Sequence, residues 1–264
     1  MRFPDDEADE NAPAIGAADG AVVNFGDEPA IAQWTETTYP ELLTRLCANP
    51  RQSGIVIVGV DGRSGSGKST FAANLARAAD HVAVVHTDDI AWHHSFFDWH
   101  DLLVDGVLSP VRRDGPPLAF RPPAWDVRNR PGAVEVPADT KVLVVEGVGA
   151  CRERLHPWFD ATVWVHSDAD LAYRRVLARG DDPVEFVDDW TAEEIPFLAN
   201  DRPWARATVV VSGQSPGART QKAVRGGGHR SRDGRMPWAS PPPRAREYDW
   251  PTTSTRRAGG YGPR

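Results

Sequence analysis

The segment from Gly62 to Ser69 limits most strongly what this chain can fold into. It reads GRSGSGKS and fits the pattern G-x-x-x-x-G-K-[ST] in full. The apolar, mostly β-branched run IVIVGV at 55–60 precedes it, and a helical pattern follows through residues 71–79. Such a run is typical of a strand that is buried on both faces. The order of buried strand, glycine-rich turn and helix therefore predicts a phosphate-binding loop.

Each residue type in this loop has a physical reason. Glycines let successive backbone N–H groups curl around a phosphate, and the helix that starts at Lys68 points its positive end at that anion. Lys68 reaches the β/γ oxygens, the Ser69 hydroxyl can ligate Mg²⁺, and Thr70 is placed for the α-phosphate. A turn that binds no nucleotide is the alternative. We expect ATP and Mg²⁺ to bind at Gly62, Arg63, Ser64, Gly65, Ser66, Gly67, Lys68, Ser69 and Thr70.

Further apolar runs predict the rest of the fold. We expect strands at 82–86, 141–145, 161–166 and 208–211, and helices at 39–47, 98–108, 168–179 and 183–200. Ser167 or Asp168 would cap the third of these helices, and Pro196 would bend the last. The proline-rich stretch 112–137 is expected to be mainly loop. Strands that alternate with helices predict an α/β fold of the P-loop NTPase type, a parallel sheet between two helical layers.

Charge and composition divide the 264 residues into three parts. Residues 1–36 are acidic and expected to be disordered, and residues 37–211 form the predicted P-loop domain. Residues 212–264 carry eleven basic and three acidic side chains, and contain no Leu, Ile or Phe. A segment of this kind buries too little apolar surface to offset its ordering entropy, so we expect a disordered basic tail. Contact of the tail with nucleic acid is a less favoured reading, and out-of-frame translation is a third.

The sequence also indicates where the chain works. No apolar run approaches the roughly 18 residues that a membrane-spanning helix needs, and the acidic N-terminus lacks the apolar core of a secretory signal. The two cysteines, Cys47 and Cys151, make no disulfide framework. We therefore expect a soluble, cytoplasmic protein with no membrane partner. The sequence indicates no oligomeric state.

Carboxylates follow two of the predicted strands. Because ligands bind at the carboxyl ends of the strands of open α/β sheets, these positions are candidates for the site. Glu146 is expected to hold Mg²⁺, directly or through water. Asp88 or its neighbour Asp89 could accept the proton of an attacking hydroxyl, and we favour Asp88. A helix-capping or loop acid is the alternative for Glu146, and a solvated turn pair is the alternative for Asp88 and Asp89.

A basic helix follows the strand at 161–166. Its side chains Arg174, Arg175 and Arg179 can close over ATP and neutralise charge on the transferring phosphoryl group. A solvated basic face is the alternative. The chain has no N-K-x-D motif and no LSGGQ-type signature, which argues against a GTPase switch and an ABC ATPase.

Together these motifs resemble the uridine kinase family of P-loop kinases over about residues 54–180. The matching segments are GRSGSGKST, the strand-end Asp88, Phe97-Asp98, Trp125-Asp126-Val127, VVEG at 144–147, and Asp168-Ala169-Asp170 with Arg174-Arg175. The resemblance implies that Asp88 acts on the nucleoside 5′-hydroxyl, that Asp98 binds ribose, and that Trp125 and Asp126 meet the base. Two departures concern the acceptor. Val127 replaces an aromatic residue, and Arg130 stands where the family has histidine.

The resemblance implies an ATP-dependent kinase of a small molecule, with a nucleoside as the expected acceptor. A kinase of another metabolite, such as a sugar or a pentose phosphate, is the first alternative. A non-catalytic ATP-binding module with a nucleic-acid-contacting tail is the second. His93, His94, Asp98 and His100 crowd together in the sequence, and an acceptor pocket is favoured there over a zinc site.

Overall fold

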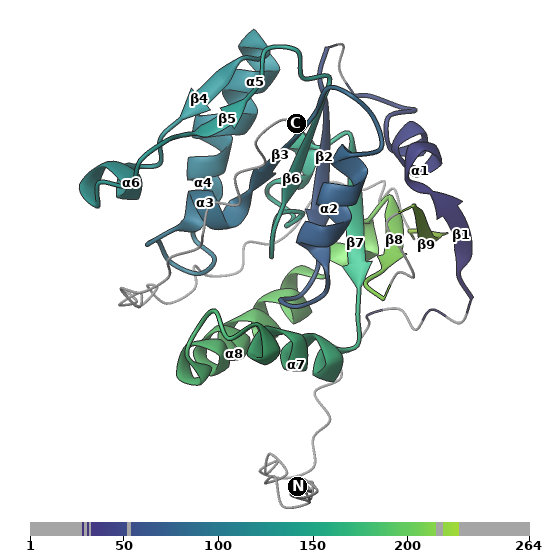
Figure 1. Ribbon diagram of the computed structural model, residues 1–264, viewed down its shortest axis with the longest axis vertical. Helices are drawn as coiled ribbons and strands as arrows, with labels where there is room; N and C mark the ends of the chain where they lie inside the picture. The colour runs from purple at the N-terminus through teal and green to yellow at the C-terminus, as the bar shows by residue number, and fades with distance from the viewer. Residues whose placement is uncertain (1–27, 29–30, 32, 52–53, 215–218, 227–264) are drawn as a thin grey trace, which may run out of the picture.

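The computed structural model describes residues 28, 31, 33–51, 54–214 and 219–226. Its centre is a seven-stranded sheet in the order β1-β9-β8-β7-β2-β6-β3 (Figure 1). Strands β8, β7, β2, β6 and β3 run parallel, whereas β9 is antiparallel to both β8 and β1. The strands are β1 (Thr35–Thr38), β2 (Val56–Asp61), β3 (Val82–His86), β6 (Val142–Glu146), β7 (Ala161–His166), β8 (Val209–Ser212) and β9 (Thr220–Arg225).

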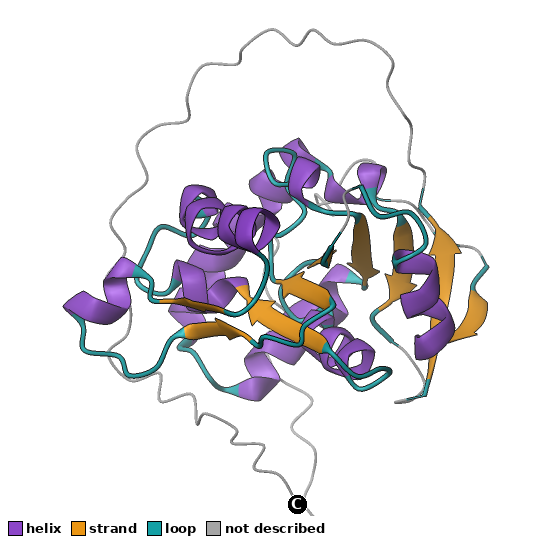
Figure 2. Cartoon of the chain, turned by 90° about the horizontal axis from the view of Figure 1, so that it is seen from above, coloured by secondary structure: helices purple, strands orange, loops and turns teal. Residues whose placement is uncertain are grey.

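Alternation along the strands explains the layers. Val58 and Val60 of β2 face one apolar cluster, whereas Ile57, the residue before Val58, faces another. The first cluster includes residues of α1 (Tyr39–Leu46) and α2 (Lys68–Ala76), and the second includes residues of α4 (His100–Leu103) and α5 (Ser109–Asp114). Helices therefore cover both faces of the sheet, as Figure 2 shows from above. The predicted α/β class is confirmed.

The remaining helices lie near the carboxyl ends of the parallel strands. They are α3 (Thr87–Ala91), α7 (Ala169–Arg179) and α8 (Val184–Asp201), and Figure 1 shows α7 and α8 side by side below the sheet. Asp168 caps α7, accepting a hydrogen bond from the Leu171 N–H at 2.8 Å. Helix α8 continues through Pro196 without a break. None of the helices in the described ranges is both long and apolar enough to cross a bilayer.

The predicted helix at 98–108 is part of a longer helical stretch. Helix α4 passes into a π-helical turn at Val104–Leu108 and then into α5. The π-turn buries Gly106, Val107 and Leu108 on the second cluster. Two 3₁₀ turns, His156–Trp158 and Pro203–Arg206, complete the helical elements.

The prediction of a loop over 112–137 is wrong. The segment contains the end of α5, the strand pair β4 (Leu118–Phe120) and β5 (Val134–Val136), and α6 (Pro123–Val127). Its prolines lie outside both strands, and Pro123 stands at the first position of α6, so they do not remove hydrogen bonds from the pair. Val134 and Val136 are buried in the second cluster, and this burial stabilises a hairpin whose composition resembles a loop.

The predicted domain limits at 37 and 211 are also too narrow. Strand β9 lies within the segment assigned to the basic tail and pairs with β8 and β1. It needs no Leu, Ile or Phe because two strands satisfy its backbone groups, and its alternate side chains Gln221 and Ala223 are each 2% exposed. At the other end, β1 begins at residue 35. In the two predicted disordered segments, residues 1–27, 29–30, 32, 215–218 and 227–264 lie outside the described residues.

Candidate nucleotide-binding site

The predicted phosphate loop connects the end of β2 to the start of α2. Two of its glycines are required by the backbone. Gly65 has φ +73°, and a Cβ there would lie 2.0 Å from the Ala172 carbonyl oxygen, which belongs to α7. Gly67 has φ +96° and precedes the first residue of α2. The close approach of α7 therefore constrains the loop as much as the ligand that it is expected to bind.

Lys68 and Ser69 form the first positions of α2. No side chain caps this helix, so its N-terminal N–H groups face the loop with the positive end of the helix dipole. Lys68 is 8% exposed, and its Nζ donates to the Arg63 carbonyl oxygen at 2.9 Å. The ammonium group is thus held over the loop by a backbone contact.

Glu146, at the end of β6, lies against these residues. The distance from His86 Nδ1 to Glu146 Oε1 is 2.5 Å, and the Ser69 side chain is near enough to the carboxylate to help lower its pKa. Burial works to raise the pKa of Glu146, but the contacts with His86 and Ser69 and the charge of Lys68 together lower it. The other oxygen, Oε2, is buried without a hydrogen-bond partner. A hydroxyl and a carboxylate with an unused oxygen suit Mg²⁺, which prefers oxygen ligands.

Asp61, the last residue of β2, was not singled out from the sequence. It is fully buried, and its carboxylate accepts from the backbone N–H groups of Gly62 (2.7 Å), Gly149 (2.8 Å) and Cys151 (2.8 Å). Burial raises its pKa to about 6, even though these hydrogen bonds act in the opposite direction. Asp61 therefore ties the start of the phosphate loop to the loop that follows Glu146. An acid that ends an otherwise apolar strand is the signal that identifies it.

The two acids after β3 differ in their surroundings. Asp89 Oδ1 accepts from Arg130 Nη2 at 2.5 Å, and the Asp89 carbonyl accepts from Trp125 Nε1 at 2.9 Å. The Arg130 guanidinium lies 3.7 Å from the centre of the Trp125 ring. Asp88 is exposed in the first turn of α3. The Asp89 carboxylate is therefore engaged by Arg130, whereas Asp88 lies at the surface beside the site.

The predicted acceptor residues do not form one group. Trp125 is 4% exposed and belongs to the second apolar cluster, so its ring packs in the core. Asp126 pairs with Arg121 at 2.7 Å, and Asp98 faces His100 Nδ1 at 3.9 Å. Within the described ranges, no hydrogen bond or ion pair joins Asp98 to Trp125, Asp126 or Arg130. No cluster of three or more His, Cys, Asp or Glu side chains suited to a metal occurs in these ranges either.

A cleft of about 650 Å³ opens beside the phosphate loop. Arg175 and Arg179 of α7 line it, whereas Arg174 is exposed and is not among the lining residues. Arg175 Nη1 donates to the carbonyl oxygens of Gly213 (3.2 Å) and Gly65 (3.4 Å), so it links α7 with the loop after β8. The other lining residues are Tyr39, Gly67, Thr70, Phe71, Asn74, Arg77, Ala178, Ser212 and Gln221.

Comparison with known proteins finds no matching family model. The chain is 27% identical over 155 residues to the inorganic pyrophosphatase TTM1 of Arabidopsis thaliana, an alignment that covers 52% of this chain. The matched region spans only 23% of that relative.

Solved structures of kinases are similar at low identity. A putative fructose transport system kinase from Silicibacter sp. TM1040 is 21% identical with a TM-score of 0.42, covering 63% of this chain and 93% of that one. A possible uridine kinase from Bacillus stearothermophilus is 20% identical with a TM-score of 0.43, covering 65% and 96%. Shikimate kinase from Bacteroides thetaiotaomicron is 16% identical with a TM-score of 0.33, covering 61% and 87%.

Proposed function

We propose that this chain transfers the γ-phosphoryl group of ATP to a hydroxyl of a small molecule, with a nucleoside as the first acceptor to test. The observation that carries the proposal is the closeness of Ser69 and Lys68, at the start of α2, to the buried Glu146 carboxylate, at the end of β6. A phosphate-binding loop, a lysine and a metal-binding acid meet there, as phosphoryl transfer requires.

The loop residues and Lys68 would hold the β- and γ-phosphates. Ser69 and Glu146 would hold Mg²⁺, because the buried Glu146 Oε2 has no other partner. The bound ion supplies positive charge that neutralises the phosphate oxygens. Arg175 and Arg179, on the wall of the cleft, would add charge against the phosphates, whereas Arg174 is exposed and does not line the cleft.

Asp88 is proposed as the base that orients and deprotonates the acceptor hydroxyl. It follows β3, two residues after His86, which contacts Glu146. Asp89 is a weaker candidate because its carboxylate already pairs with Arg130.

The identity of the acceptor depends on the resemblance to uridine kinases. The burial of Trp125 and the pairing of Asp126 with Arg121 weaken the roles that this resemblance assigns to them. A sugar or a pentose phosphate therefore stays on the list of acceptors. A non-catalytic ATP-binding module is the alternative of a different class.

The test is ADP release by the purified chain with ATP, Mg²⁺ and a panel of uridine, cytidine, adenosine, ribose and ribulose 5-phosphate. Turnover with a nucleoside supports the full proposal, and turnover with another acceptor supports the kinase alone. Lys68→Ala should lower kcat about 10²–10³-fold, because it removes a charge aimed at the developing transition state.

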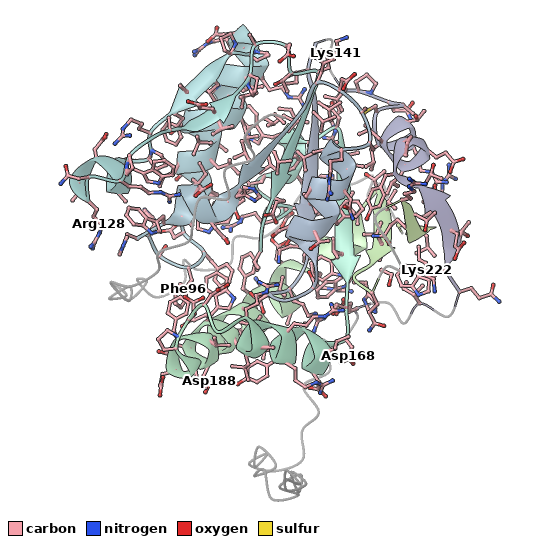
Figure 3. The ribbon with its side chains drawn as sticks, in the orientation of Figure 1. Phe96, Arg128, Lys141, Asp168, Asp188 and Lys222 are labelled. Carbon is pink, nitrogen blue, oxygen red and sulfur yellow. The ribbon has the colours of Figure 1, made fainter. Side chains whose placement is uncertain are left out.

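The matched control is Lys141→Ala. Lys141 is exposed at the opposite end of the sheet from α7 and α8 (Figure 3). The Lys141→Ala variant should keep wild-type turnover. The proposal would be contradicted if the chain binds ATP but turns over no acceptor, and if Lys68→Ala leaves ATP binding unchanged. That result would favour the binding module.

A further inference from the structure

Two buried carboxylates from distant parts of the chain contact adjacent residues of the phosphate loop. Glu28 lies near the N-terminus, within the segment expected to be disordered, and its side chain is 8% exposed. One of its oxygens pairs with Arg63 Nη2, and the other accepts from Trp164 Nε1 at 2.9 Å and lies 2.8 Å from His166 Nδ1. Glu28 therefore joins the loop to the end of β7.

Glu194 contacts the next residue of the loop. It lies on α8, is 5% exposed, and its Oε1 accepts from the Ser64 backbone N–H at 2.7 Å. Aromatic packing fixes this part of α8. The Phe197 ring stacks on Phe97 at 4.2 Å, and Trp190 packs against Phe96 at 4.8 Å, beside α8 in Figure 3.

The contacted residue Arg63 controls the position of Lys68. Its carbonyl oxygen accepts both from Lys68 Nζ at 2.9 Å and from the Ser66 N–H at 3.0 Å. A shift of Arg63 would move the acceptor that holds the ammonium group. The Glu28 contact therefore reaches Lys68 through one intervening residue.

Stability alone gives a weak reason for this arrangement. Taking carboxylates out of water is costly, and a buried ion pair often contributes little to net stability. Carboxylates beside an anion-binding loop also repel phosphate, although Arg63 offsets the charge of Glu28. Placing two of them there is favourable for function if the loop must keep one shape before the nucleotide arrives.

We propose that Glu28 and Glu194 are positioning residues that hold Arg63 and Ser64, and through Arg63 keep Lys68 placed before nucleotide binds. The expected effect on ATP binding rests on the proposed function, whereas the expected effect on the conformation of the nucleotide-free loop does not. Without either carboxylate, the loop samples other conformations, and binding must then select the competent one.

The experiment compares Glu28→Gln and Glu194→Gln with matched controls. Glu36→Gln on β1 and Glu193→Gln on α8 make the same substitution at exposed positions. The first readout is hydrogen exchange without nucleotide in peptides covering 61–70, with 142–146 of β6 as the internal reference. We expect about tenfold faster exchange in the loop and unchanged exchange in β6 for both variants.

The second readout is ATP affinity with Mg²⁺, expected to fall about tenfold in each variant and in neither control. A double-mutant cycle with Arg63→Met isolates the effect of Glu28 that acts through Arg63. Glu28→Gln should weaken ATP binding much less in the Arg63→Met background than in the wild-type chain. In an active enzyme, kcat at saturating ATP should fall less than the affinity does.

The proposal would be overturned if the loop of the two variants exchanges hydrogen as slowly as the loop of the controls. It would also be overturned if exchange is accelerated equally in the loop and in β6, because that result would indicate only a general loss of stability. If the wild-type chain binds no ATP, the proposed function fails, and loop exchange still decides whether the two glutamates hold the loop.

Discussion

His86 Nδ1 lies 2.5 Å from Glu146 Oε1, because β3 and β6 pair in parallel with these two residues in register. The hydrogen bond to Glu146 is the largest effect on the pKa of His86 and raises it, although burial acts to lower it. An imidazolium is thereby favoured beside the acid that we assign to Mg²⁺.

The raised pKa of His86 predicts how stability depends on pH. The charged imidazole is favoured in the folded state, so its contribution is fully present below about pH 6.5 and is lost as pH rises through its folded-state pKa. His86→Gln should therefore destabilise the chain most at acid pH. Urea unfolding between pH 5.5 and 8.5 measures the difference, with exposed His94→Gln as control. A difference that does not change with pH would contradict this prediction.

Asp88→Asn and Asp89→Asn should have different effects. If Asp88 is the base, its variant should lose about 10²–10⁴-fold in kcat and keep ATP affinity, because the amide cannot accept the proton. Asp89→Asn weakens the contact with Arg130 and should lower stability more than turnover. Steady-state kinetics and thermal unfolding on both variants separate these effects. The reverse pattern would move the role of base to Asp89.

Asp61→Asn should destabilise the chain by an amount that depends on pH. Its pKa of about 6 means that ionising it in the folded protein costs stability as pH rises from about 4 to about 6. The amide carries no such cost, but it leaves at least one of three N–H donors unpaired, a loss of about 1–3 kcal/mol. The variant should be less stable than wild type near pH 4, and the difference should shift by about 3 kcal/mol in favour of the variant above pH 6.5, enough to cancel or reverse it.

The measurement is the difference in unfolding free energy between Asp61→Asn and wild type at pH 4.5 and at pH 7.5. Using the difference cancels the titration of other carboxylates. A destabilisation that grows toward neutral pH would show that the buried carboxylate is stabilised by ionisation.

Truncation tests the corrected domain boundary. A chain ending at residue 211 loses β9, leaves β1 and one edge of β8 unpaired, and removes Gln221 from the cleft. It should unfold at a lower temperature and bind ATP more weakly than the whole chain. A chain ending at 226 keeps β9 and serves as the control. Equal thermal midpoints for the two truncations would mean that β9 contributes nothing to the fold.

Much of the site could be predicted from local patterns. The phosphate loop, the parallel strands and the position of Glu146 depend on residue types at short spacings, which the backbone turns directly into a strand, a turn and a helix. The wrong predictions share a cause. Strand β9 and the β4–β5 pair have weak local signals, and partners elsewhere in the chain stabilise them.

The sequence by itself determined the elements and the chemistry of the phosphate loop. Only the tertiary structure decided that β6 lies between β2 and β3, so that His86 meets Glu146, and that Glu28 and Glu194 reach Arg63 and Ser64. Hydrophobic period and turn residues act over a few neighbours, whereas strand order and register depend on packing summed over the whole core. The contacts of Glu28 with Arg63 and of Glu194 with Ser64 join residues 35 and 130 positions apart, so they depend on this packing of the whole core.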